Sequence, residues 1–414
     1  MSLSYQPEER LDVGFIPAGA PGHAGTGATQ TSSLLIDALS DHHDLTVYVY
    51  TQEQVDESLL PGDDVEYVVE DGISKLPHPL TEKLSAVEDD LDRFEKHDLV
   101  HSYSSAFIGP LADLQTDTVV TLNSYVPVCP KGDFMWQGTE KCSGPGALKC
   151  GACLAGTALR RRQGVETELR SAYVSAGKYP MVSESLDRAD DIDGYHVLSP
   201  HLKDDYVDLG LPEESLTVIP HFYDEAFLSL NGELGADVLD DPIDLLYVGG
   251  LKDIKGVHVL LAALPEITDR GFDVRLRVAG TGPYGNALRD LATDLGVDDR
   301  VDWLGYVDHD DLPELYDDAD VFVYPGLLDE PFGRVMLEAL ASQTPILSSD
   351  VGSMDDIVGR GGVLFEPGNE FALAAAFEEL VASYDRRYNA IPQQLRRFSP
   401  QVVTRDFLAL YDSL

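Results

Sequence analysis

The chain has 414 residues, of which 43% are hydrophobic, and a formal net charge of −44. This length and hydrophobic content predict a folded protein of two or three domains and exclude a disordered chain. No apolar run approaches the roughly 20 residues of a membrane span, and the first residues, MSLSYQPEER, lack the apolar stretch of a signal peptide. We therefore expect a soluble, cytoplasmic protein that binds no nucleic acid, because it offers no general phosphate-neutralising surface.

The negative charge is spread evenly along the chain. Residues 1–220 carry 15 basic and 37 acidic side chains, and residues 221–414 carry 14 and 36, so each part has a net charge of −22. An evenly acidic composition with 48 Asp and only 10 Lys resembles that of proteins from halophilic archaea. In molar salt the Debye length is only about 3 Å, so such charges repel one another little. The alternative, an acidic face for a basic partner, would concentrate the charge.

The first half of the chain shows the alternation of an α/β fold. Buried strands are predicted at LDVGFIPAG, LTVYVYT, VEYVVE, HDLVHSYS, TVVTLNSY, DGYHVLSP and LTVIPHF. A glycine-rich turn and an amphipathic helix, GAPGHAGTGATQTSSLLIDAL, follow the first of them. Strands that alternate with helices predict a parallel, doubly wound sheet.

A second series begins after the acidic stretch from Asn231 to Asp241. Its predicted strands are IDLLYVGG, VRLRVAGTG, VDWLGYV, VFVYPGL and PILSSD, with helices at GVHVLLAALPEI, YGNALRDLATDLG, DDLPELYDDA and GRVMLEALAS between them. Two further helical segments, FALAAAFEELVASY and SPQVVTRDFLALYDSL, come last. We expect two Rossmann-like doubly wound domains that face a cleft. They span residues 1–220 and 242–390, with a linker over 221–241 and a C-terminal helix over 391–414 that packs back on the first domain.

One segment departs from the acidic composition. Between residues 129 and 178 the chain carries eight basic and four acidic side chains; the basic ones are Lys131, Lys141, Lys149, Arg160, Arg161, Arg162, Arg170 and Lys178. This basic segment is typical of a surface that faces an anionic acceptor, such as a lipid phosphate or a membrane. It is equally typical of a solvated helix face that balances its own glutamates.

The strongest motif is Glu330-Pro-Phe-Gly-Arg-Val-Met-Leu-Glu338. Two carboxylates bracket a strand-to-helix turn, in which Pro331 and Gly333 open the helix. The free amides and the positive dipole end of a helix start suit a diphosphate. Glu330 would then meet the sugar end of a donor, and Glu338 its ribose.

The phrases around this motif resemble those of the family-4 retaining glycosyltransferases, which have the GT-B fold. The phrases are GGLKDIKG from Gly249 to Gly256, GTGPY from Gly280, LYDDADVFVYP before the motif, and EPFGRVMLEALASQTPILSSDVGSMDDIV from Glu330. The resemblance covers most of the second domain. It implies that Lys255 contacts the donor diphosphate, that Glu330 holds donor-sugar hydroxyls and that Glu338 holds the ribose.

The resemblance also implies which other residues bind the donor. The donor-binding set is Gly25, Gly27, Lys255, Gly280, Phe332, Gly333, Arg334, Val335 and Glu338. The backbone from Phe332 to Val335 is expected to lie along the phosphates. Glycines at 25 and 27 would let the loop after the first strand approach them.

Two positions depart from the family pattern. Gly250 stands where the family has an arginine, so one diphosphate-binding cation is missing unless Lys252 or Arg334 replaces it. Asn123, in TLNSY, stands where a histidine is common. His101, at the end of its predicted strand, is the nearest remaining histidine, and we expect it to act in catalysis with Glu330 and Lys255.

All four cysteines lie close together, at Cys129, Cys142, Cys150 and Cys153. A Cys-x-x-Cys pair with two further cysteines nearby supplies the ligands of a tetrahedral thiolate zinc site, and we expect a structural zinc here. Disulfides or free thiols are a second interpretation, although a reducing cytoplasm disfavours disulfides. An iron–sulfur cluster, which uses the same ligands, is a third.

We therefore expect a retaining glycosyltransferase, of hexosyltransferase type, that takes its sugar from a nucleotide diphosphate donor. The resemblance implies a lipid-linked or polysaccharide glycan acceptor in cell-surface glycan biosynthesis, with peripheral contact at the inner face of the membrane. It implies neither a dedicated nucleophile nor a catalytic metal. The alternatives are a glycosyltransferase-like protein that binds nucleotide or glycan without transfer, and a sugar-phosphate synthase of the same fold.

Overall fold

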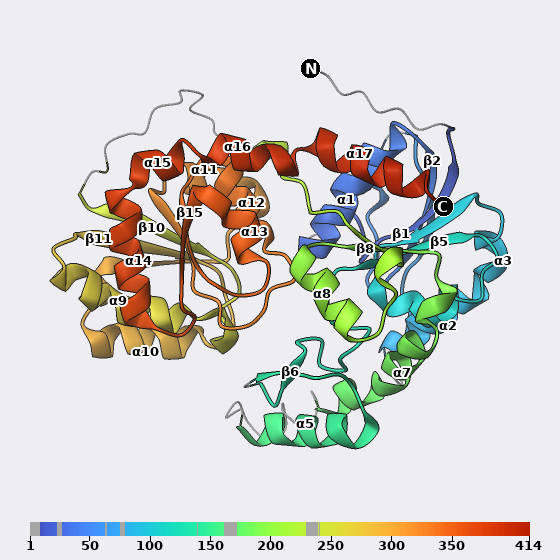
Figure 1. Cartoon of the computed structure of the whole chain (residues 1–414), viewed down its shortest axis with the longest axis horizontal. Coiled ribbons are helices and arrows are strands. Elements are labelled where there is room, and N and C mark those ends of the chain that lie inside the picture. Colours follow the sequence, from blue (N-terminus) through green and yellow to red (C-terminus); the bar gives the residue numbers. More distant parts are fainter. Residues whose placement is uncertain are drawn as a thin grey trace. The chain divides into compact units, whose positions relative to one another are not determined.

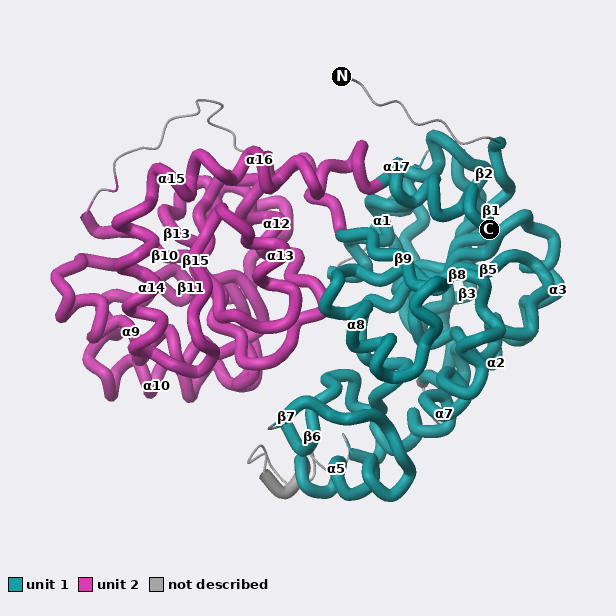
Figure 2. Tube along the Cα trace, in the orientation of Figure 1, with its two compact units in different colours: residues 1–220, 404–414 teal, residues 221–403 magenta. Residues whose placement is uncertain are grey.

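The computed structural model describes residues 9–22, 27–62, 64–74, 79–138, 140–160, 172–228, 239 and 241–414. It divides into two compact units, residues 1–220 with 404–414 and residues 221–403 (Figure 2). Gly25, the side chain of Arg160, residues Arg161, Arg162 and Arg170, and most of the expected linker lie outside the described residues. No helix among the described residues is long and apolar enough to span a membrane.

The first unit contains a parallel seven-stranded sheet with the order β3-β2-β1-β4-β5-β8-β9. Its strands are β1 (Asp12–Ile16), β2 (Asp44–Tyr50), β3 (Glu66–Glu70), β4 (Leu99–Ser102), β5 (Asp117–Leu122), β8 (Gly194–Val197) and β9 (Leu216–Val218). The central strands are buried along nearly their whole length, as a parallel sheet covered on both faces requires. The seven predicted strands are therefore confirmed.

The helices of this unit connect its strands. They include α1 (Gly27–Ser40), α2 (Pro79–Asp89), α3 (Leu91–Phe94), α4 (Ile108–Leu111), α5 (Ala147–Arg160), α7 (Tyr179–Asp187) and α8 (Pro200–Asp208). Between β5 and α5 lies a two-stranded hairpin of β6 (Met135–Trp136) and β7 (Glu140–Lys141). This hairpin and α5 lie apart from the sheet (Figure 1).

The second unit contains a parallel six-stranded sheet with the order β12-β11-β10-β13-β14-β15. The strands are β10 (Ile243–Val248), β11 (Val274–Ala279), β12 (Val301–Gly305), β13 (Val321–Tyr324), β14 (Ile346–Ser349) and β15 (Gly362–Phe365). Five of them match predicted strands, whereas the sequence analysis did not predict β15. The strand order reverses between β10 and β13, which is where doubly wound sheets bind their ligands.

The helices of the second unit cover this sheet. They are α9 (Val257–Asp269), α10 (Gly285–Leu295), α11 (Leu312–Asp317), α12 (Arg334–Ala341), α13 (Met354–Val358), α14 (Glu370–Ala382), α15 (Tyr384–Tyr388) and α16 (Ile391–Leu395). Buried side chains of α9, α10 and α14 form one apolar core with β10 and β11, in which Leu245, Leu260 and Phe377 are fully buried. This core fixes where the strands end, and hence where the loops beyond them begin.

The expected C-terminal helix over 391–414 is wrong in its extent. The segment contains two helices, α16 and then α17 (Pro400–Tyr411). Ser399 between them is extended, with φ −71° and ψ 145°, because the residue before a proline is disfavoured in the helical region. Residues 404–414, which include most of α17, belong to the first unit.

Candidate active site

The loops after β10 and β13 bring together Lys255 and Glu330, two of the residues that were expected to act in catalysis. Lys255 closes a short 3₁₀ turn, Asp253–Lys255, after β10, and Glu330 lies in the loop that follows β13. The two strands are paired neighbours in the sheet. Because both loops leave the carboxyl ends of parallel strands at the point where the order reverses, they meet at the usual ligand site of such a sheet.

Lys255, Glu330 and Tyr324 form a compact polar cluster. The Lys255 Nζ lies 2.7 Å from Oε2 of Glu330 and 3.2 Å from the Tyr324 hydroxyl, which donates to the same Oε2 at 2.6 Å. The lysine and glutamate side chains are 28% and 26% exposed, whereas Tyr324 is buried. Burial, and then the negative charge of Glu330, raise the pKa of Tyr324 well above its usual value, so the phenol stays protonated as a donor.

This cluster leaves hydrogen-bonding capacity for a ligand. Among the described residues, Oε1 of Glu330 has no hydrogen-bond partner, so it can accept from a hydroxyl group. An ammonium group has three N–H donors, of which Glu330 and Tyr324 take two. The third donor of Lys255 can therefore meet an anion, such as a phosphate oxygen.

The backbone of Glu330 is held by the turn after β14. Ser353 donates to the Glu330 carbonyl through its hydroxyl at 3.1 Å and through its amide at 3.3 Å. Gly352 has a φ of +57°, and a Cβ there would lie 2.5 Å from the same carbonyl. Gly352 and Ser353 were not expected to have a role, because nothing in the sequence shows that the turn after β14 comes back to Glu330.

Glu338 lies on α12 and is only 8% exposed. The Tyr316 hydroxyl donates to its Oε2 at 2.9 Å, and Nε of Arg334 lies 4.0 Å from its Oε1. Burial, and then the charge of Glu338, raise the pKa of Tyr316 well above its usual value. Tyr316 and Tyr324 thus each hold one of the two motif carboxylates, and neither tyrosine was singled out from the sequence.

The remaining donor-binding candidates of the second unit lie in adjacent loops. Gly333 is the extended residue that precedes α12, and Phe332 is buried, edge-on to His221 at 4.7 Å between ring centroids. The Val335 carbonyl lies 3.4 Å from the Tyr316 hydroxyl. Gly280 follows β11 with a φ of +155°, and a Cβ there would lie 1.8 Å from the Gly249 carbonyl. Only glycine permits this approach of the two strand ends.

The candidates of the first unit fare differently. Gly27 begins α1 and is exposed, whereas Gly25 lies outside the described residues. The side-chain amide of Asn123 donates to the Tyr103 carbonyl at 3.0 Å. This hydrogen bond joins the loop after β5 to the loop after β4. Gly250, in the second unit, has open space where a Cβ would stand.

The expectation that His101 is catalytic is contradicted by its surroundings. The side chain is fully buried in β4, with Tyr411 of α17 at Nδ1 (2.6 Å) and Thr121 at Nε2 (2.8 Å). Thr121 in turn bonds His196, whose Nε2 can only donate to the Ile219 carbonyl, 2.7 Å away. Because this carbonyl can only accept, the direction of each hydrogen bond in this series of side chains is fixed. Tyr411 donates to His101, His101 to Thr121, and Thr121 to His196. Burial lowers the pKa of His101 well below its usual value, so it is a neutral packing residue.

Three of the four described lysines of the basic segment are engaged locally, and Lys178 is the fourth. Lys131 lies 3.2 Å from Asp133, Lys141 pairs with Asp205, and Lys149 donates to Ser143 at 2.7 Å. These contacts favour the interpretation of a self-balanced surface for this part of the segment. All four cysteines are free thiols in the same region.

Comparison with known proteins finds a family match in the second unit. Residues 237–397 match the family model for group 1 glycosyl transferases. An uncharacterized glycosyltransferase of Methanocaldococcus jannaschii is 34% identical over 188 residues, which are 44% of this chain and 48% of the relative. Glycogen synthase of Mycobacterium tuberculosis is 38% identical over 159 residues, 37% of this chain and 38% of that enzyme. The chain thus spans at most about half the length of these relatives.

Solved structures share the fold over the whole chain. Sucrose-phosphate synthase from Thermosynechococcus elongatus has a TM-score of 0.71 at 20% identity, covering 98% of this chain and 99% of that chain. HepE of Anabaena, in a complex with UDP-glucose, has a TM-score of 0.65 at 18% identity, covering 98% and 100%. At these identities the likeness establishes the fold, which is the two-domain α/β GT-B arrangement with parallel sheets.

Proposed function

We propose that this protein is a retaining glycosyltransferase of the family-4 type, which transfers a hexose from a nucleotide diphosphate donor. The observation that carries the proposal is the cluster of Lys255, Tyr324 and Glu330 at the strand-order reversal of the second unit. A family match over residues 237–397 supports it. So does the UDP-glucose bound to HepE, a protein of the same fold.

In this proposal each residue of the cluster meets one part of the donor. Lys255 donates its third N–H to the diphosphate and stabilises the charge that develops there as the bond to the sugar breaks. Glu330 accepts sugar hydroxyls at Oε1 while Tyr324 and Lys255 hold its other oxygen. Glu338 and Tyr316 lie at the ribose end.

The transfer step needs no protein nucleophile. The acceptor oxygen forms its bond to the anomeric carbon on the face from which the diphosphate leaves, and its proton passes to the leaving phosphate oxygen. Configuration is thereby retained. Catalysis then consists of positioning and charge stabilisation, for which an aligned cation and a fixed carboxylate suffice.

The acceptor we propose is a lipid-linked or polysaccharide glycan at the inner face of the membrane, for cell-surface glycan synthesis. This part of the proposal rests on the family resemblance, on Lys178 and on the arginines at 160–162 and 170, because Lys131, Lys141 and Lys149 are engaged locally. We further propose that the protein works in molar salt, since its charge is −44. Unfolding on dilution from molar to about 0.1 M KCl would support that, and equal melting at both would refute it.

A second candidate is a protein that binds nucleotide sugar without transfer. Two observations favour it: the Asn123 amide, where family members commonly have a histidine, is tied to Tyr103, and Gly250 provides no cation. Donor binding without turnover in the presence of lipid and oligosaccharide acceptors would establish this alternative.

The test is nucleotide-sugar turnover in high salt. UDP- and GDP-linked hexoses are incubated with the protein, and the free nucleotide and the anomer of the product are measured. Glu330→Gln keeps the shape of the side chain and should lose at least about tenfold in rate, since it removes a charge-assisted contact. Glu314→Ala, an exposed glutamate on α11, is the matched control. Equal turnover by both variants, or an inverted product, would refute the proposed mechanism.

A further inference from the structure

The four cysteines lie around one cavity in a part of the first unit that the proposed donor site does not use. We name residues 128–157 the cysteine module; it comprises the loop after β5, the β6–β7 hairpin and the first turns of α5. Cys129 and Cys153 are buried, and Cys142 and Cys150 are half-buried. The same cavity is lined by Lys131, Trp136 and Lys149.

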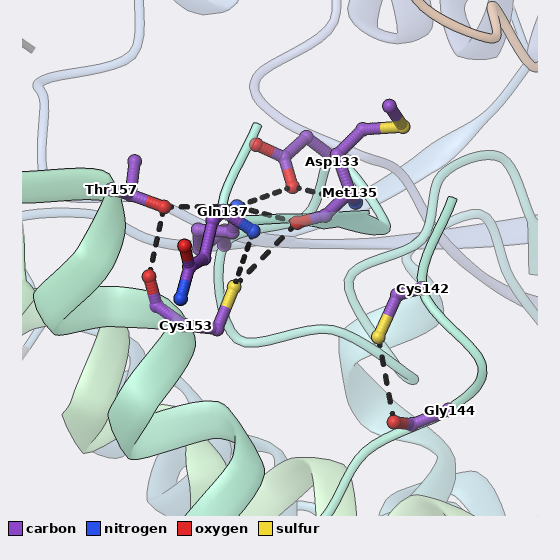
Figure 3. A network of polar contacts seen from close by, with 8 residues as sticks. Asp133, Met135, Gln137, Cys142, Gly144, Cys153 and Thr157 are labelled. Atoms are coloured by element: carbon purple, nitrogen blue, oxygen red, sulfur yellow. Dashed lines mark hydrogen bonds and ion pairs between the residues drawn. The ribbon is translucent and has the colours of Figure 1, made fainter. Parts of the chain in front are cut away.

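Backbone groups of the module are turned toward the sulfurs. The Gln137 amide donates to Sγ of Cys153 at 3.1 Å, and the Gly146 amide to Sγ of Cys150 at 3.5 Å. In Figure 3 the Cys153 sulfur accepts from the Gln137 amide, whereas the Cys153 and Cys142 thiols donate to the Met135 and Gly144 carbonyls at 3.6 and 3.4 Å. Amide donors to sulfur are the outer-shell contacts that orient and tune metal-bound thiolates.

The backbone of the module is strained where it approaches these sulfurs. Phe134 and Gln137 both have positive φ, 52° and 50°, although neither is glycine. Gln137 is the donor to Cys153, and the Phe134 carbonyl accepts from the Cys142 amide at 2.8 Å. Left-handed conformations of such residues persist only where surrounding interactions determine them.

The apolar core of the module is small, although Lys141 ties the module to Asp205 of α8. Its hairpin has two residues in each strand, and such a hairpin is marginal in water. One aromatic anchor is evident, the stacking of buried Phe134 on Tyr125 at 5.1 Å. A segment with so small a core commonly depends on a disulfide or a metal, and none of the four thiols is in a disulfide.

We propose that Cys129, Cys142, Cys150 and Cys153 bind one zinc ion as a tetrahedral four-thiolate site that holds the cysteine module together. Cys150 and Cys153 are three residues apart on α5, so both face the cavity from one side of the helix. Four thiolates around Zn²⁺ leave a net charge of −2, part of which Lys149 on the cavity wall offsets, since the two groups to which it donates are neutral. The metal contributes folding free energy and takes no part in catalysis.

Binding requires the sulfurs to draw together. Among the described residues, no three of the four sulfurs lie within 4.8 Å of one another, whereas sulfurs on one zinc are about 3.8 Å apart, as follows from a Zn–S bond of about 2.3 Å. A change of one χ1 rotamer moves a cysteine sulfur by about 3 Å. Since all four already line the same cavity, side-chain rotation supplies the movement.

The proposal is tested on the whole protein, purified in high salt without chelator or reductant. We expect about one zinc per chain after gel filtration, and four thiols that react with a thiol reagent only once a chelator is added. Cobalt added to the stripped protein should show the intense bands of tetrahedral cobalt thiolate. Cys150→Ser with Cys153→Ser should lose the metal. Leu148→Ala, on the same helix but 92% exposed, should keep it.

Three results would overturn the proposal. Four thiols that react at once in metal-free protein would show ordinary free cysteines. Two thiols missing without metal would show a disulfide. Iron with acid-labile sulfide would show a cluster. If the double variant does not fold, the metal content and the cobalt spectrum of the wild-type chain decide the question. None of these readouts depends on glycosyl transfer, so the failure of either proposal leaves the other standing.

Discussion

Replacing Tyr324 by phenylalanine isolates the contribution of one buried hydroxyl to the proposed active site. The hydroxyl donates to Oε2 of Glu330 at 2.6 Å and lies 3.2 Å from Nζ of Lys255. The ring stays in place, because Tyr324 is only 4% exposed and phenylalanine fills nearly the same volume. The change therefore removes one of the two contacts to Oε2 of Glu330 and leaves the contact with Lys255.

The size of the effect follows from the kind of bond that is lost. A hydrogen bond to a charged group contributes about 1.5–3 kcal/mol. If Glu330 must be fixed to meet the sugar, that energy appears as a loss of about 10- to 150-fold in kcat/KM. Binding of the free nucleoside diphosphate, which has no sugar, should change less than about threefold.

The assay is donor-dependent nucleotide release, with calorimetric binding of the nucleoside diphosphate alongside it. Tyr384→Phe is the matched control, because its hydroxyl donates to the Asp320 carbonyl at the other end of β13. Unchanged kcat/KM in Tyr324→Phe, at a melting temperature equal to that of the wild type, would refute the positioning role. An equal loss of sugar-free nucleotide binding would also refute it.

Three further predictions concern other contacts. Tyr411→Phe removes the hydroxyl that donates to the buried His101, and it should lower the free energy of unfolding by about 1–3 kcal/mol. Denaturant titration measures this loss. The control Tyr306→Phe, at a side chain that is 68% exposed, should leave the free energy of unfolding unchanged. The bond between His309 and Asp224 raises the pKa of the histidine and lowers that of the aspartate. The contribution of protonated His309 to the free energy of unfolding is therefore fully present below pH 6.5 and is lost as the pH rises through the raised pKa of the histidine. Between pH 5 and 9 the melting temperature of His309→Asn should fall less with rising pH than that of the wild type. Gly250→Arg should tighten donor binding by up to about tenfold at the lowest salt concentration at which the protein stays folded, and by less in molar salt. Unchanged binding at that lowest concentration would place this backbone away from the diphosphate.

The sequence predicts the framework well because each strand carries its own signal. Short runs of β-branched and aromatic residues indicate buried strands of a parallel sheet, as in IDLLYV and DTVVTL. The strand β15 (GVLF) was missed because it is four residues long and follows a glycine-rich turn that reads as loop. The break before α17 could have been read from Pro400, whose effect on Ser399 is local.

The candidate site was predictable only in part. Lys255 and Glu330 were found because each lies in a short motif that can be recognised from a few neighbouring residues. Tyr324 and Ser353 act through contacts that depend on which loops meet, and a linear pattern does not contain this. His101 failed for the same reason, since a strand-end histidine does not show that a helix 310 residues later covers it.

The order of residues in the first unit has a consequence for its biosynthesis. Phe407 and Tyr411, which cover His101, are synthesised only after the whole of the second unit. Until then the nascent first unit lacks these two aromatic side chains and the donor to Nδ1 of His101, so we expect it to complete its folding only after the second unit has been made. A chain that ends at Ser399 should accordingly be cleaved by protease within β4 faster than the full chain, and equal protection would show that the sheet closes without its final helix.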